Sequence, residues 1–150
     1  MSAKTLSIAM VFASFASTAV WGEEPALAGE WRVKSETLYG KPSIGQVGCI
    51  YRFEKDALVA FQYVGHEAKP ATGVVDFTAK PWTLDIELDD DRPAVGGAGP
   101  RVGIMELKGD LLTICVSGSA GAGVPRPKKF ESKIGQSYVL TVLERVKKGK

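Results

Sequence analysis

Residues 101–117, RVGIMELKGDLLTICVS, consist of two runs of alternating apolar residues on either side of Gly109 and Asp110. A glycine at the first central position suits a type II′ turn, so this stretch predicts a β-hairpin with a two-residue loop. One face of the hairpin is apolar and must be covered by further strands, because an isolated hairpin is not stable in water. The facing pairs that this turn implies are Leu107 with Leu112, Met105 with Ile114 and Gly103 with Val116 on the apolar face, and Glu106 with Thr113 and Ile104 with Cys115 on the other.

Runs with the same two-residue period occur on both sides of the hairpin. They are typical of half-buried strands, and glycine, proline and acidic clusters between them predict turns. In the run 59–63 the alternation places Val59 on one face with Phe61 and Tyr63. The strands expected besides the hairpin are 30–38, 47–53, 59–63, 72–78, 82–88 and 137–146, and the turns and loops are 39–42, 45–48, 54–57, 65–67, 89–100 and 117–127.

This pattern predicts an all-β domain of eight strands, since no ten-residue stretch beyond residue 22 repeats its apolar residues at helical spacing. An eight-stranded antiparallel up-and-down barrel is the economical arrangement, because closure removes both exposed sheet edges. A two-sheet β-sandwich uses the same pattern and is the alternative.

The N-terminus has the pattern of a secretory signal peptide. Lys4 precedes an uncharged apolar run, 5–20, and small residues end at Gly22 before an acidic pair. Cleavage is expected after Gly22, or alternatively after Ala19, and an uncleaved anchor is disfavoured because the run is short for a membrane span. The protein is therefore expected to be exported to the periplasm or the medium as one domain, 23–150, with no stable membrane span.

The charge of the chain is almost balanced. It carries 19 Lys and Arg against 17 Asp and Glu, and Lys4 would be lost with the signal peptide. A nucleic-acid binder needs a concentrated basic face, so no nucleic-acid partner is expected. The basic end formed by Lys147, Lys148 and Lys150 is interpreted as a solvated tail.

The two cysteines, Cys49 and Cys115, could form a disulfide in an oxidising compartment. They lie on the second and seventh expected strands, which are not neighbours in an eight-stranded meander. A disulfide cannot bridge Cα atoms more than about 7 Å apart. Free buried thiols are therefore favoured over a bond.

The first and last expected strands carry a possible closing contact. Gly29 and Trp31 open the first strand, and Arg145 lies near the end of the last one. In a closed meander these strands are neighbours, so the Arg145 guanidinium is expected to stack on the Trp31 indole. This arrangement resembles the Gly-x-Trp motif and terminal arginine of lipocalins and related calycin barrels.

A longer pattern runs through the C-terminal half. It consists of Asp76, Lys80, Pro81, Leu84, Asp85, Gly103, Ile104, Glu106, Leu107, Lys108, Gly109, Asp110, Leu112, Thr113, Cys115, Arg126, Pro127, Phe130 and 143–145. It resembles an uncharacterised family of exported domains expanded in planctomycetes. The chain departs from that family at Met105, where an aromatic residue is usual, and in 117–124. The resemblance implies a lipocalin-like barrel and carries no activity.

One pair of acidic residues is a candidate metal site. If Lys80 and Pro81 are the whole loop between two strands, Asp76 lies opposite Asp85. Facing like charges destabilise a sheet, and a bound cation would explain them. A longer turn, or a nearby Lys or Arg that neutralises the pair, is the favoured alternative. The acidic run 89–91 lacks the spacing of a calcium loop and is interpreted as a solvated turn.

No residue set predicts an enzyme. His66 is the single histidine and falls on an expected loop without a nucleophile elbow or further metal ligands. The run 96–99 lacks the residues of a phosphate loop. We therefore expect no catalytic residues and no cofactor.

Two functions are compatible with the pattern. Barrels of about eight strands can hold one small ligand, so a small apolar or amphipathic ligand is the first hypothesis. The alternative is a structural or inhibitor-like module that presents loops 89–100 and 117–127 to another exported protein. Arg126 and Pro127, ahead of Phe130, could be a recognition element, but a local salt bridge and a stiffened chain return are favoured.

Overall fold

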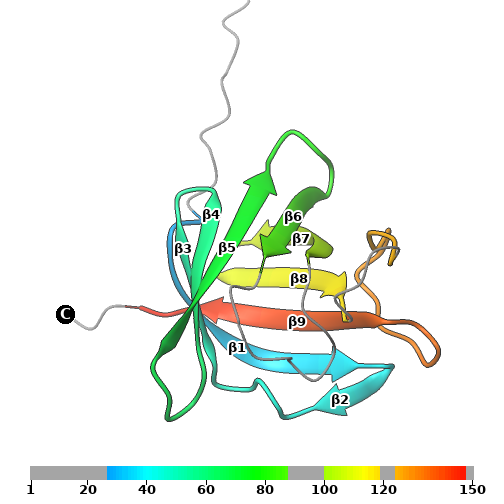
Figure 1. The fold of residues 1–150 in the computed structure, drawn as a ribbon, viewed down its shortest axis with the longest axis horizontal. Coiled ribbons are helices and arrows are strands. Elements are labelled where there is room, and N and C mark those ends of the chain that lie inside the picture. The colour runs from blue at the N-terminus through cyan, green and yellow to red at the C-terminus, as the bar shows by residue number, and fades with distance from the viewer. Residues whose placement is uncertain (1–26, 88–99, 119–123, 148–150) are drawn as a thin grey trace, which may run out of the picture.

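The computed structural model describes residues 27–87, 100–118 and 124–147, shown as the coloured ribbon in Figure 1. All regular structure in these ranges is β-strand. The strands are β1 (Gly29–Leu38), β2 (Lys41–Ser43), β3 (Ile50–Glu54), β4 (Ala57–Gln62), β5 (Ala68–Asp76), β6 (Trp82–Glu87), β7 (Arg101–Lys108), β8 (Leu111–Ser117) and β9 (Tyr138–Arg145).

The strands form one closed antiparallel sheet. From β3 to β9 each strand pairs with the next along the chain, β3 also pairs with the first part of β1, and β9 pairs with β1 along most of its length. β2 adds to the second part of β1 as one extra strand. The predicted eight-stranded lipocalin-like barrel is confirmed, and a two-sheet sandwich is not the arrangement.

The barrel has two distinct ends. The closed end carries the tight connections 55–56, 77–81 and 109–110, and the open end carries 39–49, 63–67 and 118–137 as far as they are described. At the closed end the Trp31 indole is buried and its Nε1 donates to the Leu27 carbonyl at 2.9 Å. The Arg145 guanidinium lies 4.1 Å from the Trp31 ring centroid. The predicted stack is present, and it closes this end.

The hairpin of β7 and β8 has the predicted register from Gly103–Val116 to Leu107–Leu112. Gly109 has a φ of +60° while Asp110 does not have a positive φ, as a type II′ turn requires. Met105, Leu112 and Ile114 belong to the core and Leu107 packs against it. The apolar face therefore points into the barrel.

A β-bulge in β4 changes the predicted face of one residue. Phe53 pairs with Leu58 and Arg52 with Ala60, so Val59 is the extra residue. The prediction that Val59 shares a face with Phe61 is wrong, because the bulge turns Leu58 into the core instead. β5 also begins before the expected residue 72. β2 occupies part of the predicted turn 39–42.

Packed side chains fill the half of the barrel nearest the closed end. Leu27 from the lead-in segment covers this packing at the closed end. The fully buried apolar residues are Leu27, Trp31, Val33, Phe53, Leu58, Leu84, Met105, Leu112, Cys115 and Leu143, all but Cys115 in one core cluster.

The outer face of the hairpin is also covered. Ile104 and Cys115 face away from the core cluster, yet both are buried. The segment 124–137, here called the strap, lies across this face, and the Cys115 thiol donates to the Glu131 carbonyl at 3.5 Å. The expected loop therefore acts as a second layer over β7 and β8.

Several sequence predictions lie outside the described residues: the signal peptide with its cleavage sites, Leu88, the acidic run 89–91, the glycines of 96–99, and Lys148 and Lys150. Within the described part of the chain, no helix is long and apolar enough to cross a membrane.

Candidate functional site

A pocket of about 600 Å³ opens at the open end of the barrel. It lies between the β2–β3 connection and the β4–β5 connection, and we call it the mouth pocket. Its apolar residues are strongly exposed: 90% of Ile44 and 66% of Val64 are accessible to solvent. The described lining is Ile44, Gly45, Val47, Cys49, Tyr63, Val64 and His66.

Glu36 places a carboxylate beside this pocket from inside the barrel wall. A bulge between Val33 and Ser35 shifts the alternation of β1, so Glu36 faces the interior opposite Thr141 of β9. Glu36 is only 6% exposed. A Cβ on Gly45 would lie 3.9 Å from Glu36 Oε1, so the carboxylate borders the pocket lining.

The Glu36 carboxylate has no hydrogen bond or ion pair with any described residue. Buried charges are normally paired and hydrogen-bonded, because removal from water is costly. The Glu36 oxygens are not among the fully enclosed polar atoms without a partner, so the carboxylate keeps contact with solvent and has spare acceptor capacity at the edge of the pocket.

Tyr51 of the core reaches the β2–β3 connection that borders the mouth pocket, although its side chain is not part of the described lining. Its hydroxyl donates to Gln46 Oε1 at 2.6 Å, and its ring meets Phe61 edge-on at 4.5 Å between centroids. Burial raises the pKa of Tyr51 well above its ordinary value, and the charge of Glu36 raises it further. The phenol is therefore a neutral hydrogen-bond donor, held in place by Gln46.

Arg101 lies on the far side of the barrel from β1. It pairs with Ile86 of the core at the open end of β7. Its Nε is buried and has no hydrogen-bond partner among the residues that the structure describes. Its charge lowers the pKa of Tyr51, but this effect is smaller than that of Glu36. Among the described residues, Glu36 and Arg101 both act on Tyr51 near the mouth, and they do not form an ion pair with each other.

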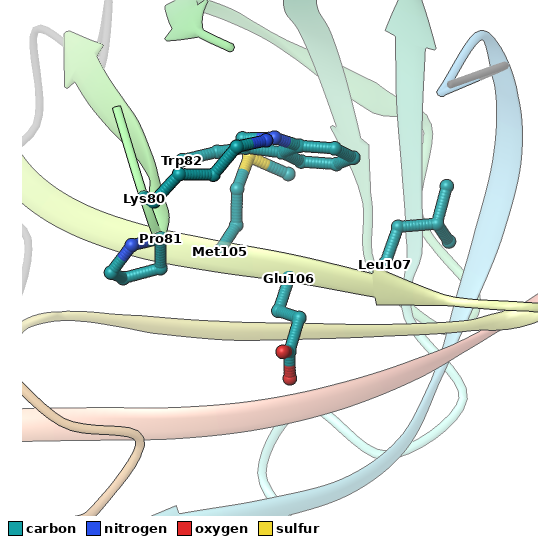
Figure 2. Close-up of a pocket in the computed structure, with 6 residues that line it drawn as sticks. All are labelled: Lys80, Pro81, Trp82, Met105, Glu106 and Leu107. Carbon is teal, nitrogen blue, oxygen red and sulfur yellow. The ribbon is translucent and has the colours of Figure 1, made fainter. Parts of the chain in front are cut away.

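A second pocket, of about 310 Å³, lies at the closed end and is shown in Figure 2. Trp82 and Met105 are cross-strand partners on its inner side, and the Lys80 ammonium lies 5.8 Å from the Trp82 ring centroid. Phe77 meets Trp82 edge-on at 4.9 Å. Figure 2 shows Glu106 on the opposite side of β7 from Met105. Lys80 therefore covers an aromatic side chain, and Glu106 does not face it.

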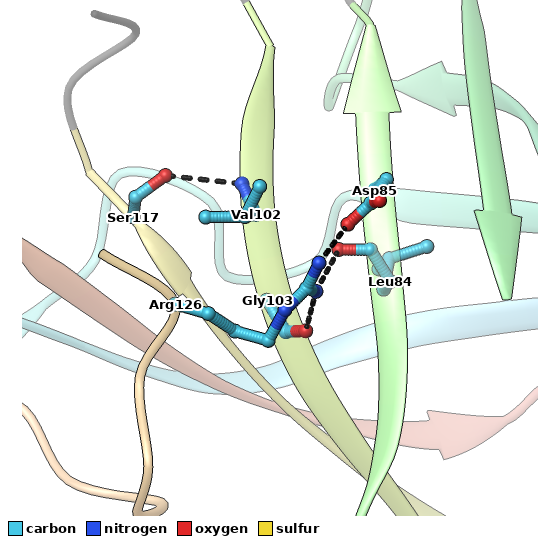
Figure 3. Close-up of polar contacts among 6 residues, drawn as sticks. All are labelled: Leu84, Asp85, Val102, Gly103, Ser117 and Arg126. Carbon is cyan, nitrogen blue, oxygen red and sulfur yellow. Dashed lines mark hydrogen bonds and ion pairs between the residues drawn. The ribbon is translucent and has the colours of Figure 1, made fainter. Parts of the chain in front are cut away.

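Arg126 joins the strap to the barrel wall through hydrogen bonds and an ion pair (Figure 3). Its Nη1 donates to the Gly103 carbonyl at 2.6 Å and to the Leu84 carbonyl at 3.3 Å. Its Nη2 contacts Asp85 Oδ1 at 2.6 Å. The favoured interpretation of Arg126 and Pro127, a local salt bridge at the chain return, agrees with this geometry. A further pocket, of about 340 Å³, lies along the strap and includes Arg126 in its lining.

The predicted pairing of Asp76 with Asp85 is wrong. Asp76 lies opposite Thr83 and Asp85 opposite Val74, because the connection 77–81 is longer than Lys80 and Pro81 alone. Asp76 Oδ1 instead accepts hydrogen bonds from the Thr78 hydroxyl and amide, which lower the pKa of Asp76. The two carboxylates therefore do not form a site.

The remaining single residues have separate locations. His66 is exposed and lines the mouth pocket. Cys49 and Cys115 are both free and buried, as the sequence favoured. Cys49 belongs to the core cluster whereas Cys115 lies under the strap, so they occupy opposite faces of the wall. Among the described residues, no group of three or more His, Cys, Asp or Glu side chains is placed to hold a metal ion.

The sequence interpretation missed Glu36, Tyr51 and Arg101 as site residues. Regular alternation from Trp31 and Val33 would put Ser35, and not Glu36, on the inward face of the strand. Nothing in the sequence marks the bulge that reverses this alternation. Tyr51 falls in the expected strand 47–53, but its polar neighbours could not be assigned without the strand order.

Comparisons of the chain with family models, with curated proteins and with solved structures find no match. The similarity to the planctomycete family stays a prediction.

Proposed function

We propose that this protein is an exported lipocalin-like module that binds a small amphipathic ligand in the mouth pocket. The observation that carries the proposal is the combination, in one pocket, of an exposed apolar rim with a carboxylate at its edge. The rim is Ile44, Val47 and Val64, and Glu36 Oε1 lies 3.9 Å from where a Cβ on Gly45 of the lining would be.

The size and character of the pocket support a small ligand. Pockets that bind small molecules usually measure about 300–1,000 Å³ and combine apolar walls with a few polar groups. At about 600 Å³ the mouth pocket is within this range. Contiguous exposed apolar side chains on a soluble domain favour a binding site over an inert surface.

Export and family membership are parts of the same proposal. They are supported by the signal-peptide pattern of 1–22 and by the residues shared with the planctomycete family, such as Gly109, Asp110 and Cys115. Detection of the processed chain in the medium or periplasm, with an N-terminus at residue 23, would support both the route and the cleavage site.

Binding is tested with a neutral fluorescent probe, N-phenyl-1-naphthylamine, titrated into the full-length protein. We expect a saturable rise in fluorescence that the Ile44→Ser variant weakens several-fold. Ile134→Ser is the matched control, because Ile134 is 79% exposed and does not line the mouth pocket. Absence of saturable binding, or equal weakening in both variants, would contradict the proposal.

The alternative is an interaction module that uses loops 89–100 and 117–127. Most of the first loop and part of the second lie outside the described residues. A pull-down from exported fractions with both loops shortened distinguishes the two functions. Loss of a partner, together with absent probe binding, would favour the interaction module.

A further inference from the structure

A carboxylate lies at the edge of the mouth pocket. Glu36 borders the lining at Gly45, and its charge raises the pKa of Tyr51 more than Arg101 lowers it. The described lining residues include no Lys or Arg. A ligand in this pocket would therefore have the Glu36 carboxylate at its edge and no cationic side chain in the described lining.

Glu36 also has acceptor capacity that no described residue fills. It is buried to more than nine-tenths and no described residue supplies it with a hydrogen bond or an ion pair. A buried carboxylate is stabilised when a cation with N–H donors reaches it, and such charge-assisted hydrogen bonds are stronger than neutral ones. The Tyr51 hydroxyl donates its hydrogen bond to Gln46, so it does not donate to the Glu36 carboxylate.

Access to the carboxylate runs past Gly45. A Cβ at this position would lie 3.5 Å from Ser43 Oγ and 3.9 Å from Glu36 Oε1. A single methyl group fits there, but a branched side chain would lie between the carboxylate and the pocket. The absence of a side chain at Gly45 leaves Glu36 approachable from the mouth.

We propose that the ligand of the mouth pocket is a cationic amphiphile whose protonated amine binds the Glu36 carboxylate while its apolar part lies against Ile44 and Val64. This inference rests on the proposed function, since it specifies the head group of a ligand in the same pocket. An amine offers donors that Glu36 can accept, and a short alkyl chain matches the apolar rim. A carboxylate head group would instead be repelled by Glu36.

The test is calorimetric titration of the full-length protein with three ligands that share one chain: octylamine, 1-octanol and octanoate, at pH 7. We expect octylamine to bind at least about tenfold more tightly than 1-octanol, the ratio expected for one charge-assisted hydrogen bond, and octanoate to bind most weakly.

Two variants and one control locate the effect. Glu36→Gln is expected to lower octylamine affinity to that of 1-octanol while 1-octanol affinity stays within twofold. Gly45→Val keeps the carboxylate and is expected to weaken octylamine several-fold by blocking its approach. Glu87→Gln is the control, because Glu87 is an exposed carboxylate near the same end, on the outer face of β6.

The outcomes separate the two proposals. If none of the three ligands binds, both the proposed function and the cationic head group are refuted. If 1-octanol or octanoate binds the wild-type protein as tightly as octylamine, ligand binding stands and the cationic head group is refuted. This ranking needs only the wild-type protein, so it holds even if Glu36→Gln fails to fold.

Discussion

The hydrogen bonds and ion pair of Arg126 lead to a quantitative prediction about stability. The perturbation is Arg126→Met, which keeps an apolar stem but removes the guanidinium that joins the strap to Leu84, Gly103 and Asp85. The matched variant is Asp85→Asn, which removes the charge of the ion-pair partner and leaves both carbonyl contacts in place.

The expected changes in the free energy of unfolding follow from how exposed the Arg126 and Asp85 side chains are. The Arg126 side chain is 32% exposed and that of Asp85 is 61% exposed, so water screens their ion pair and it contributes about 0–1 kcal/mol. Hydrogen bonds from a charged donor to protein acceptors contribute about 1.5–3 kcal/mol. We therefore expect Arg126→Met to lower the free energy of unfolding by about 2 kcal/mol and Asp85→Asn by less than about 1 kcal/mol.

Urea denaturation followed by circular dichroism measures both changes. A loss of about 2 kcal/mol corresponds to a fall of about 1 M in the midpoint, with an unchanged slope. Mass-spectrometric thiol labelling in native buffer gives a second readout. Cys115 should be labelled faster in Arg126→Met than in the wild type, since the strap covers it. Equal losses in the two variants, or a loss below about 0.5 kcal/mol in Arg126→Met, would refute the reasoning.

Two further predictions concern the barrel interior. Gly103→Ala should lower the free energy of unfolding, measured by urea denaturation, by about 1–3 kcal/mol, because the added methyl would lie 2.5 Å from Val116 Cγ1. The control Gly45→Ala should change this free energy by less than about 0.5 kcal/mol, because its methyl meets only ordinary contacts. Equal effects of the two substitutions would contradict the packing argument. Since burial raises the folded-state pKa of Tyr51 above its ordinary value of 10.0, its contribution to stability is fully present below pH 10 and declines above it. Between about pH 10.5 and 11.5, the free energy of unfolding should fall with pH less steeply in Tyr51→Phe than in the wild type, by about 1.4 kcal/mol per pH unit. The control is Tyr39→Phe, an exposed tyrosine, which should leave the wild-type slope unchanged. Identical pH profiles for Tyr51→Phe and the wild type would show that Tyr51 ionises freely in the folded state.

The hairpin shows how much of the fold was predictable. Its register from Gly103 to Leu107 follows from a glycine that tolerates positive φ and from an apolar period of two, both of which are local properties. The stack of Arg145 on Trp31 was also predictable once closure was assumed, because closure makes the first and last strands neighbours.

Predictions failed where the backbone departed from regular alternation. The bulges at Val59 and between Val33 and Ser35 reverse which side chains face inward, and the longer connection after Asp76 moves it away from Asp85. The extra residues of these bulges are Lys34 and Val59, neither of them a glycine, so no local residue marks where the alternation breaks. The candidate site was missed for this reason, since Glu36 faces the interior only because of a bulge.

The sequence by itself determined the approximate positions of the eight barrel strands and the hairpin turn, because turn residues and a two-residue period act over a few neighbouring positions. Only the tertiary structure decided that Glu36 is buried beside the mouth pocket and that Cys115 is covered by the strap. Those facts depend on which distant segments pack against each strand, and that packing is fixed by the whole barrel at once.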